Sequence, residues 1–460
     1  MYLLDESSKI PLHIQLYEAI KEDILSNHSV GDKLPSIRNV AIRYNLSKTT
    51  VETAYSQLYA EGYIESRPKS GYYVCELYFD TFKTHQIPKP KIHNAGTAYR
   101  YDFFPARLHA DDFPLKLWKR LYTKVINTSV DFGAYPDGQG ELFLREQIAK
   151  YLKDSRGVCC NAGQIIVTHG FGDAMELLAK LVKMRYSHFA QEIPGYHIAH
   201  KVFDAYGYQI HPVAVNENGL DIEALKQSVA EVVYITPTHQ YPTGATMPIG
   251  NRLKLIQHMQ SIGGLIIEDD YDSELSYHNR PIPSLQGLDR GENVVYLGTF
   301  AKALSPAIRV GYMVVPQWVL EHFHQSYDAH FARVSLPTQL TLAHFMQEGH
   351  WQRHINRMRI LNKKKHQAMV DALNRHLKNS FKIVAQGAGL SVHIVSKNSR
   401  FDYQKLRNLA EQNHIAIYLA KERSGGGYEA VRMGFGGFRL GEIDKAVAAF
   451  SKVWFEIDDM

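Results

Sequence analysis

The sequence has 460 residues, of which 45% are hydrophobic and 22% charged, a composition typical of globular proteins and enough chain for about three domain-sized units. No stretch approaches the roughly 18–20 apolar residues of a membrane span, and the opening residues MYLLDESSKI lack the layout of a signal peptide. We therefore expect a cytoplasmic protein without a membrane partner. Cys75, Cys159 and Cys160 are too few for a disulfide framework and lack the spacing of a metal site.

Three short helices are predicted at the N-terminal end. Apolar residues recur at i, i+4 spacing over residues 11–27, and Ser36 and Ser47 stand where N-caps of two further helices are expected. The third helix should end at Gly62. The runs YIES and YYV, joined by the turn RPKSG, then predict a two-stranded hairpin. Helix, helix-turn-helix and wing together form a DNA-binding layout.

Charge alone does not decide whether this region binds DNA. The formal net charge of +5 permits a polyanionic partner without requiring one. Residues 1–75 carry eight Lys/Arg against nine Asp/Glu, but residues 33–71 carry six of those cations and only three anions. The positive charge thus gathers where phosphates would lie, although a solvated surface of mixed charge would give a similar count.

The run LPSIRNVAIRYNLSKTTVETAYSQLYAEGYIESRPKSGYYV resembles the winged helix-turn-helix of GntR-type regulators, over nearly all of residues 10–75. The resemblance implies double-stranded DNA as a partner. It implies that Arg38 holds a phosphate, that the recognition helix opens with four polar residues and that three residues form the wing tip. The four residues that open the recognition helix are Ser47, Lys48, Thr49 and Thr50. The three residues of the wing tip are Lys69, Ser70 and Gly71. Lys48 stands where the family more often has Arg, so the base read there is open.

Residues 76–100 contain Pro88 and Pro90 without helical periodicity, which predicts a semi-extended linker between a domain at 1–75 and another at 101–460. In the second domain, helical stretches alternate with apolar runs such as QIIVTHG, EVVYITPTHQ, GGLIIEDDYD and NVVYLGTFAK. This pattern indicates a mainly parallel sheet covered by helices, an α/β fold. Ligands bind at the carboxyl ends of such strands.

The strand endings carry the chemistry. Gly170-Phe171-Gly172 before a helix could cradle a phosphate, and Glu268, Asp269 and Asp270 could be a metal site or a solvated loop. Lys302 and Arg309 follow a further strand. We assign no metal, because pyridoxal 5′-phosphate needs all these parts together: an amine, a carboxylate, an anion cradle with an arginine and an aromatic face.

Residues 101–455 resemble the fold-type I aminotransferase domain, and four runs are similar to those of MocR/GabR-type regulators: YPDGQGELFLREQIAKYLKDSRGV, TPTHQYPTGATMPIGNRLKLI, IIEDDYDSE and GTFAKALSPAIRVGYMV. The resemblance implies that Lys302 is the Schiff-base lysine, Asp269 faces the pyridine nitrogen and Tyr271 bonds the phenolic oxygen. It also implies that Tyr196 stacks on the cofactor ring and that Arg432 binds the carboxylate of an effector. Four residues would bind the phosphate, namely Arg309, Phe171, Gly172 and Thr299.

The sequence also departs from the plain aminotransferases. Tyr241 replaces the Asn that precedes PTG, so His239 or Gln240 could take over its contact, and Ala301 replaces a hydroxyl residue before the lysine. Ile198 lies where some relatives add a basic effector contact.

Three functions follow from this combination. The first is a homodimeric transcription regulator that senses pyridoxal phosphate, or an amino compound forming an external aldimine at Lys302. The second is an active aminotransferase with an accessory DNA-binding domain. The third is a regulator whose cofactor is only structural.

Overall fold

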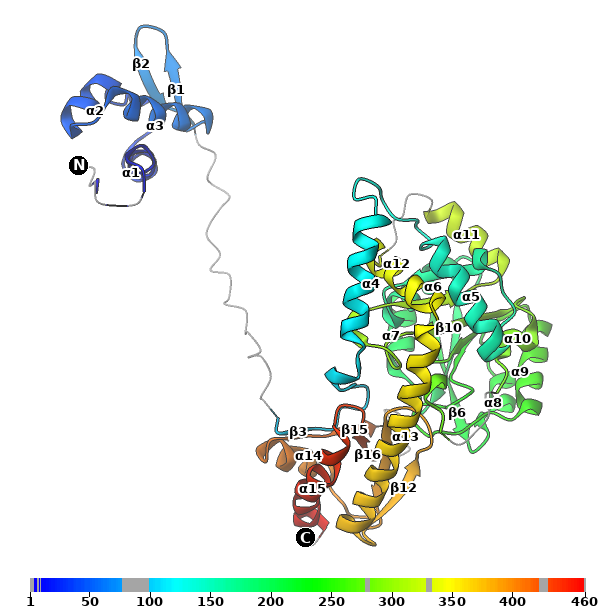
Figure 1. Cartoon of the computed structure of the whole chain (residues 1–460). Coiled ribbons are helices and arrows are strands. Elements are labelled where there is room, and N and C mark those ends of the chain that lie inside the picture. The colour runs from blue at the N-terminus through cyan, green and yellow to red at the C-terminus, as the bar shows by residue number, and fades with distance from the viewer. Residues whose placement is uncertain are drawn as a thin grey trace. The chain divides into compact units, whose positions relative to one another are not determined.

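The computed structural model describes residues 4–5, 8, 10–76, 99–277, 282–327, 333–421 and 429–458. The chain divides into two compact units, residues 1–96 and 97–460 (Figure 1). Most of the predicted linker, residues 76–100, lies outside the described residues.

The small unit contains the three predicted helices and the hairpin: α1 (Leu12–Asn27), α2 (Ile37–Tyr44), α3 (Lys48–Ala60), β1 (Ile64–Arg67) and β2 (Gly71–Val74). Ser36 and Ser47 cap α2 and α3 as expected, because their side chains accept the backbone N–H groups of Asn39 and Thr50. The core of this unit includes Leu16, Ile20, Val51 and Leu58. Each of these four side chains is at most 1% exposed. The strands pair antiparallel.

The large unit is built on an eight-stranded sheet in the order β4-β11-β10-β9-β8-β5-β6-β7. The strands are β4 (Ile165–Thr168), β5 (His188–Ile193), β6 (Gln209–Asn216), β7 (Gly219–Leu220), β8 (Val232–Ile235), β9 (Leu265–Asp269), β10 (Val294–Thr299) and β11 (Gly311–Val314). Only β7 and β11 run against the others in this sheet, so the predicted mainly parallel α/β architecture is confirmed.

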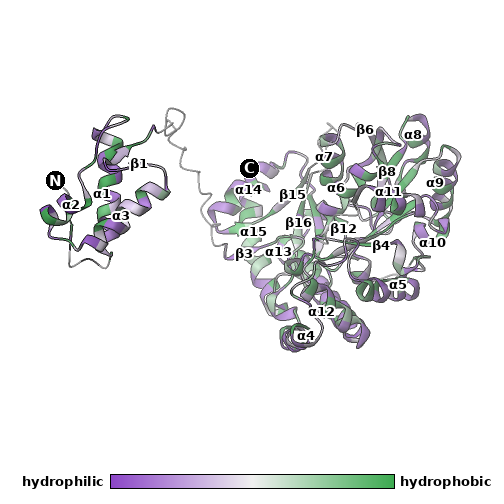
Figure 2. Cartoon of the chain, turned by 90° about the horizontal axis from the view of Figure 1, so that it is seen from above, coloured by the Kyte–Doolittle hydropathy of each residue, from purple (hydrophilic) through white to green (hydrophobic). Residues whose placement is uncertain are grey.

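Helices cover both faces of the sheet: α4 (Leu115–Thr128), α5 (Leu142–Arg156), α6 (Phe171–Val182), α7 (His197–Ala205), α8 (Ile222–Gln227), α9 (Ile249–Ser261), α10 (Leu285–Asp289), α11 (Gln317–Tyr327) and α12 (Leu336–Gln347). Successive strand residues join opposite cores: Tyr234 and Ile267 pack with α6 and α7, whereas Val233 and Ile266 pack with α8 and α9. In Figure 2 the central strands are mainly hydrophobic and the helices around them carry both colours.

A second sheet follows the long helix α13 (His350–Leu377). Its antiparallel order is β12 (Phe381–Ala385), β13 (Ser391–Ser396), β16 (Glu429–Gly434) and β15 (Tyr418–Lys421), with α14 (Tyr403–Gln412) and α15 (Ile443–Asp458) beside it. The short strand β3 (Tyr101–Asp102) pairs with β14 (Ile415–Ala416) near the start of the large unit. Within the described ranges, no helix combines the length and apolar character needed to cross a membrane.

Candidate cofactor site

Lys302 lies just beyond the carboxyl end of β10, beside the end of β9. The residue is half-buried, and its Nζ is 5.9 Å from the ring centroid of Tyr271. Burial lowers the pKa of Lys302 to about 8, while the Asp272 carboxylate opposes that shift. A substantial fraction of the amine is therefore neutral near pH 8, which is the form that attacks a carbonyl.

Asp269 ends β9 in a buried position and is 7% exposed. The Tyr234 hydroxyl donates to its Oδ2 at 2.6 Å. Burial raises the pKa of Asp269 to about 7; the bond from Tyr234 lowers it, and neighbouring carboxylates add to the rise. A cation placed against this carboxylate would relieve the cost of its burial.

The other two acidic residues of this run do not form a three-carboxylate cluster with Asp269. Glu268 accepts the backbone N–H groups of Leu285 and Gln286 at 2.9 and 3.0 Å, and Asp270 pairs with Arg156 at 2.6 Å. Within the described residues no group of three potential ligands could hold a metal ion.

The cradle predicted at the start of α6 lies against Arg309. Gly170 is the N-cap of α6 with φ 81°, and a Cβ atom added there would lie 2.6 Å from Nη2 of Arg309. The guanidinium donates to the His169 carbonyl at 3.3 Å and is exposed. Phe171 and Gly172 supply the first N–H groups of the helix, which have no intrahelical partner. An arginine and a helix N-terminus thus meet where an anion could bind.

Thr299 contributes differently from the cradle residues. Its Oγ1 accepts the backbone N–H of Ala301 at 3.1 Å, so this hydroxyl helps to shape the turn that carries Lys302.

Aromatic rings line the same site. Tyr196, half-buried at the start of α7, packs edge-on against Phe171 with centroids 5.2 Å apart and against Tyr241 at 5.5 Å. Burial raises the pKa of Tyr196, with the charge of Asp269 as the next contribution. Tyr196 and Asp269 therefore belong to the same site.

Arg432 projects from β16 toward these rings. Its guanidinium lies 5.0 Å from the ring centroid of Tyr241, and its Nε is buried without a hydrogen-bond partner. His393 is its neighbour on β13, and burial, reinforced by the charge of Arg432, lowers the pKa of His393 to about 3. The arginine therefore faces a neutral histidine and retains hydrogen-bonding capacity for an anion.

His239 and Tyr271 complete the site. The Tyr271 hydroxyl donates to the His239 carbonyl at 3.1 Å, and Nδ1 of His239 lies 2.8 Å from Oδ2 of Asp272. Burial opposes protonation of His239, but the Asp272 carboxylate outweighs it and raises the pKa. Gln240 instead donates to the Pro194 carbonyl and supports the loop.

These groups fit pyridoxal phosphate. The buried, pKa-raised carboxylate suits a protonated ring nitrogen, the space above Gly170 would be lost to any Cβ, and the unpartnered Nε of Arg432 suits a carboxylate. The predicted residues Lys302 and Tyr271 are close in space, and the charges of Asp269 and Arg432 both act on Lys302.

Sequence reasoning missed Tyr234, Asp272 and Arg156 in this region. Tyr234 sits inside an apolar run and has the pattern of a core aromatic residue. Arg156 is at the end of α5, far in sequence from its partner Asp270, so no local pattern connects the two.

The predicted DNA-binding residues lie on one helix-turn-helix and its wing. Most are exposed: Arg38 on α2, Ser47, Lys48 and Thr49 at the start of α3, and Lys69 and Ser70 in the hairpin turn, with Thr50 and Gly71 half-buried. Lys48 pairs with Glu52 at 3.1 Å. Ser47 and Thr50 share a hydrogen bond, so these two hydroxyls also serve the helix cap.

Comparison with known proteins matches both units. Residues 108–450 match the family described as aminotransferase class I and II, and residues 12–74 match the gntR family of bacterial regulatory proteins. The HTH-type transcriptional regulator YdeL of Bacillus subtilis is 34% identical over 461 residues, covering 98% of each chain. The probable rhizopine catabolism regulatory protein MocR of Rhizobium meliloti is 34% identical over 411 residues, covering 85% of this chain and 83% of its own.

Among solved structures, the multiple substrate aminotransferase of Thermococcus profundus aligns with a TM-score of 0.70 and 20% identity. The alignment covers 79% of this chain and 93% of that one. This likeness establishes the fold of the large unit.

Proposed function

The chain belongs to the gntR-family transcription regulators that carry an aminotransferase class I and II domain, and we propose that this domain binds pyridoxal phosphate at Lys302. The signal sensed is pyridoxal phosphate itself or an amino compound that reacts with it there. Binding then changes how the small unit engages double-stranded DNA. A role on the chromosome places the protein in the cytoplasm.

One observation carries this proposal. The Nζ of Lys302 lies 5.9 Å from the Tyr271 ring centroid, and burial lowers the pKa of Lys302 to about 8. The charge of Asp269 acts on Lys302, and Asp269 itself is buried and accepts a hydrogen bond from Tyr234. Shifted pKa values on a lysine and a neighbouring buried carboxylate are typical of functional sites, so the pair supports a ligand that uses both.

The chain's own residues would then act as follows. Arg309 and the N–H groups of Phe171 and Gly172 would hold the phosphate, and Asp269 would keep the ring nitrogen protonated. The bound cofactor supplies an aldehyde that condenses with amines and a ring that draws electron density from the attached carbon. Tyr271, which the His239 carbonyl holds in position, would orient the phenolic oxygen of the cofactor.

Recognition of an amino compound would fall to Arg432. Its guanidinium can bind a carboxylate with two hydrogen bonds. The Tyr241 ring, 5.0 Å away, attracts the same cation. Lys302, when it is not bonded to the cofactor, would hold a proton near Asp272, whose charge favours the protonated amine.

We also propose a homodimer. In the described part of the chain, α4 exposes Leu115 at its start by 66%, and the segment after α4 exposes Phe132 and Tyr135 by 75% and 76%. A second copy would cover this apolar area. Light scattering at micromolar concentration should give twice the chain mass, and a monomer would contradict this assignment.

Borohydride trapping tests the cofactor assignment. The full-length protein is mixed with pyridoxal phosphate and reduced, and digestion should yield a pyridoxyl group on the Lys302 peptide. Lys302→Ala should carry none, whereas the exposed residue change Lys364→Ala should leave trapping intact. Labelling spread over surface lysines would contradict the proposal, and sustained conversion of an amino acid with a 2-oxo acid would shift it to the aminotransferase.

A further inference from the structure

Residues 99–112, here called the entry segment, include the last two residues of the predicted linker, and they are hydrogen-bonded to the end of β16. Gly434 donates its N–H to the Phe103 carbonyl at 3.1 Å, and His109 donates to the Gly436 carbonyl at 3.0 Å. The approach is close, because a Cβ on Gly434 would lie 2.6 Å from the Phe103 oxygen. A shift of β16, which carries Arg432, would therefore also move this segment.

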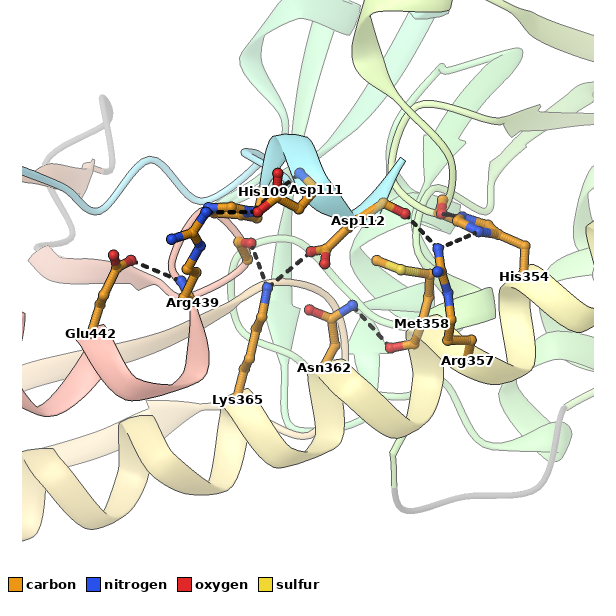
Figure 3. Close-up of polar contacts among 12 residues, drawn as sticks. His109, Asp111, Asp112, His354, Arg357, Met358, Asn362, Lys365, Arg439 and Glu442 are labelled. Carbon is orange, nitrogen blue, oxygen red and sulfur yellow. Dashed lines mark hydrogen bonds and ion pairs between the residues drawn. The ribbon is translucent and has the colours of Figure 1, made fainter. Parts of the chain in front are cut away.

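Lys365 fastens the same two segments from α13. It is 2% exposed, and its Nζ donates to Oδ2 of Asp112 and to the Gly436 carbonyl, both at 3.0 Å (Figure 3). A buried ammonium is costly unless it is paired and hydrogen-bonded, so this lysine holds its acceptors in a fixed arrangement.

His354, three turns earlier on α13, reaches the lysine loop of the cofactor site. Its Nε2 lies 2.8 Å from the carbonyl oxygen of Ala303, the residue after Lys302. Burial lowers the pKa of His354, which favours the neutral imidazole. Because a carbonyl can only accept, Nε2 carries the proton and Nδ1 is left to accept from Arg357 at 3.3 Å.

Arg357 closes the connection to the entry segment. Its Nη2 donates to the Asp112 carbonyl at 2.6 Å, as Figure 3 shows. One helix, α13, therefore contacts the Lys302 loop through His354 and the entry segment through Arg357 and Lys365.

We propose that Lys365, with His354 and Arg357, forms a coupling cluster that transmits ligand binding at Lys302 and Arg432 to residues 99–112 and so to the linker. This inference rests on the proposed function of the same site. The three are positioning residues, since none is placed against the cofactor. A ligand shifts such a cluster only if it binds two arrangements of the cluster with different affinity. The hydrogen bonds to the Ala303 and Gly436 carbonyls are the contacts that would differ between these arrangements.

Hydrogen–deuterium exchange of the full-length protein with and without pyridoxal phosphate tests the coupling. Lys365→Met removes both bonds at nearly constant volume, and Lys364→Met is the matched control on the exposed side of α13. Arg357→Gln is a milder variant, because Arg357 is exposed and its loss leaves the Lys365 pair intact. Trapping at Lys302 is measured on the same samples.

In the wild type and Lys364→Met, the cofactor should change exchange of peptides within 99–112 by about two- to tenfold, the effect of altering one ordinary hydrogen bond. Lys365→Met and Arg357→Gln should keep trapping at Lys302 and lose that change. If Lys365→Met does not fold, Arg357→Gln decides.

Two results would overturn the coupling while leaving the cofactor assignment intact. The first is trapping at Lys302 in the wild type with unchanged exchange at 99–112. The second is a wild-type response in both variants. Absence of trapping in the wild type would overturn the proposed function and the coupling together.

Discussion

Replacing Tyr234 by Phe tests the role assigned to Asp269. The change removes the hydroxyl that donates to Asp269 at 2.6 Å, while the ring stays fully buried and packed edge-on against Phe171 at 6.0 Å. A hydrogen bond to an ionised group contributes about 1.5–3 kcal/mol. If that bond stabilises the carboxylate that pairs with the cofactor ring, the dissociation constant for pyridoxal phosphate should rise about 10- to 150-fold.

The effect should depend on pH in a defined direction. The Tyr234 bond lowers the pKa of Asp269, so its loss raises that pKa above about 7 and reduces the carboxylate fraction at neutral pH. The ratio of the variant to the wild-type dissociation constant should therefore fall as pH rises from about 7 to about 9. Titration of Lys302 is common to both proteins and cancels in this ratio.

The assay is a fluorescence or absorbance titration of apoprotein with pyridoxal phosphate at several pH values. Tyr208→Phe is the matched control, because this buried tyrosine donates at 2.9 Å to the Ala179 carbonyl, a neutral acceptor. Thermal unfolding should be followed for both variants. Equal binding by the two variants, or a ratio that does not vary with pH, would refute the assignment of Asp269.

Three further outcomes are expected. Gly170→Ala places a side chain in a backbone conformation that costs about 1–3 kcal/mol, and its Cβ would clash with Arg309. Titration should therefore show weaker binding of pyridoxal phosphate. Equal weakening for pyridoxal, which lacks the phosphate, would argue against a phosphate cradle. Stopped-flow capture of the aldehyde should accelerate as pH rises and level off above about 8, because the pKa of Lys302 is lowered to about 8; a rate still rising toward pH 10 would indicate an ordinary lysine. Lys48→Ala should weaken DNA binding in gel-shift titrations, with relaxed base preference if it contacts a base and a shallower salt slope if it contacts phosphate; unchanged affinity would remove Lys48 from the interface.

The sequence predicted the strand endings well because the parallel sheet brings them to one edge. It did not predict that the adjacent carboxylates Glu268, Asp269 and Asp270 have different partners. Side chains alternate along a strand, so Glu268 points to the N-terminus of α10 while Asp269 faces the site. The partner of Asp270 is Arg156, 114 residues away, and such a long-range pair leaves no local signature.

The coupling cluster was equally hidden. Lys365 belongs to the run KKK on α13, and composition alone suggests three exposed lysines. Helical geometry turns this one inward, where Asp112 and the Gly436 carbonyl compensate its charge. In contrast, the caps at Ser36 and Ser47 were predictable, since a cap depends only on neighbouring residues.

The central claim is that the ligand state of Lys302 changes DNA binding. The most direct measurement is the affinity of the full-length protein for a DNA site obtained by in vitro selection, with and without pyridoxal phosphate at fixed salt, for the wild type and Lys302→Ala. A coupled regulator should show a change of about 5- to 150-fold in the wild type and none in Lys302→Ala. Equal affinities in the wild type, on samples whose Lys302 is trapped by borohydride, would contradict the account.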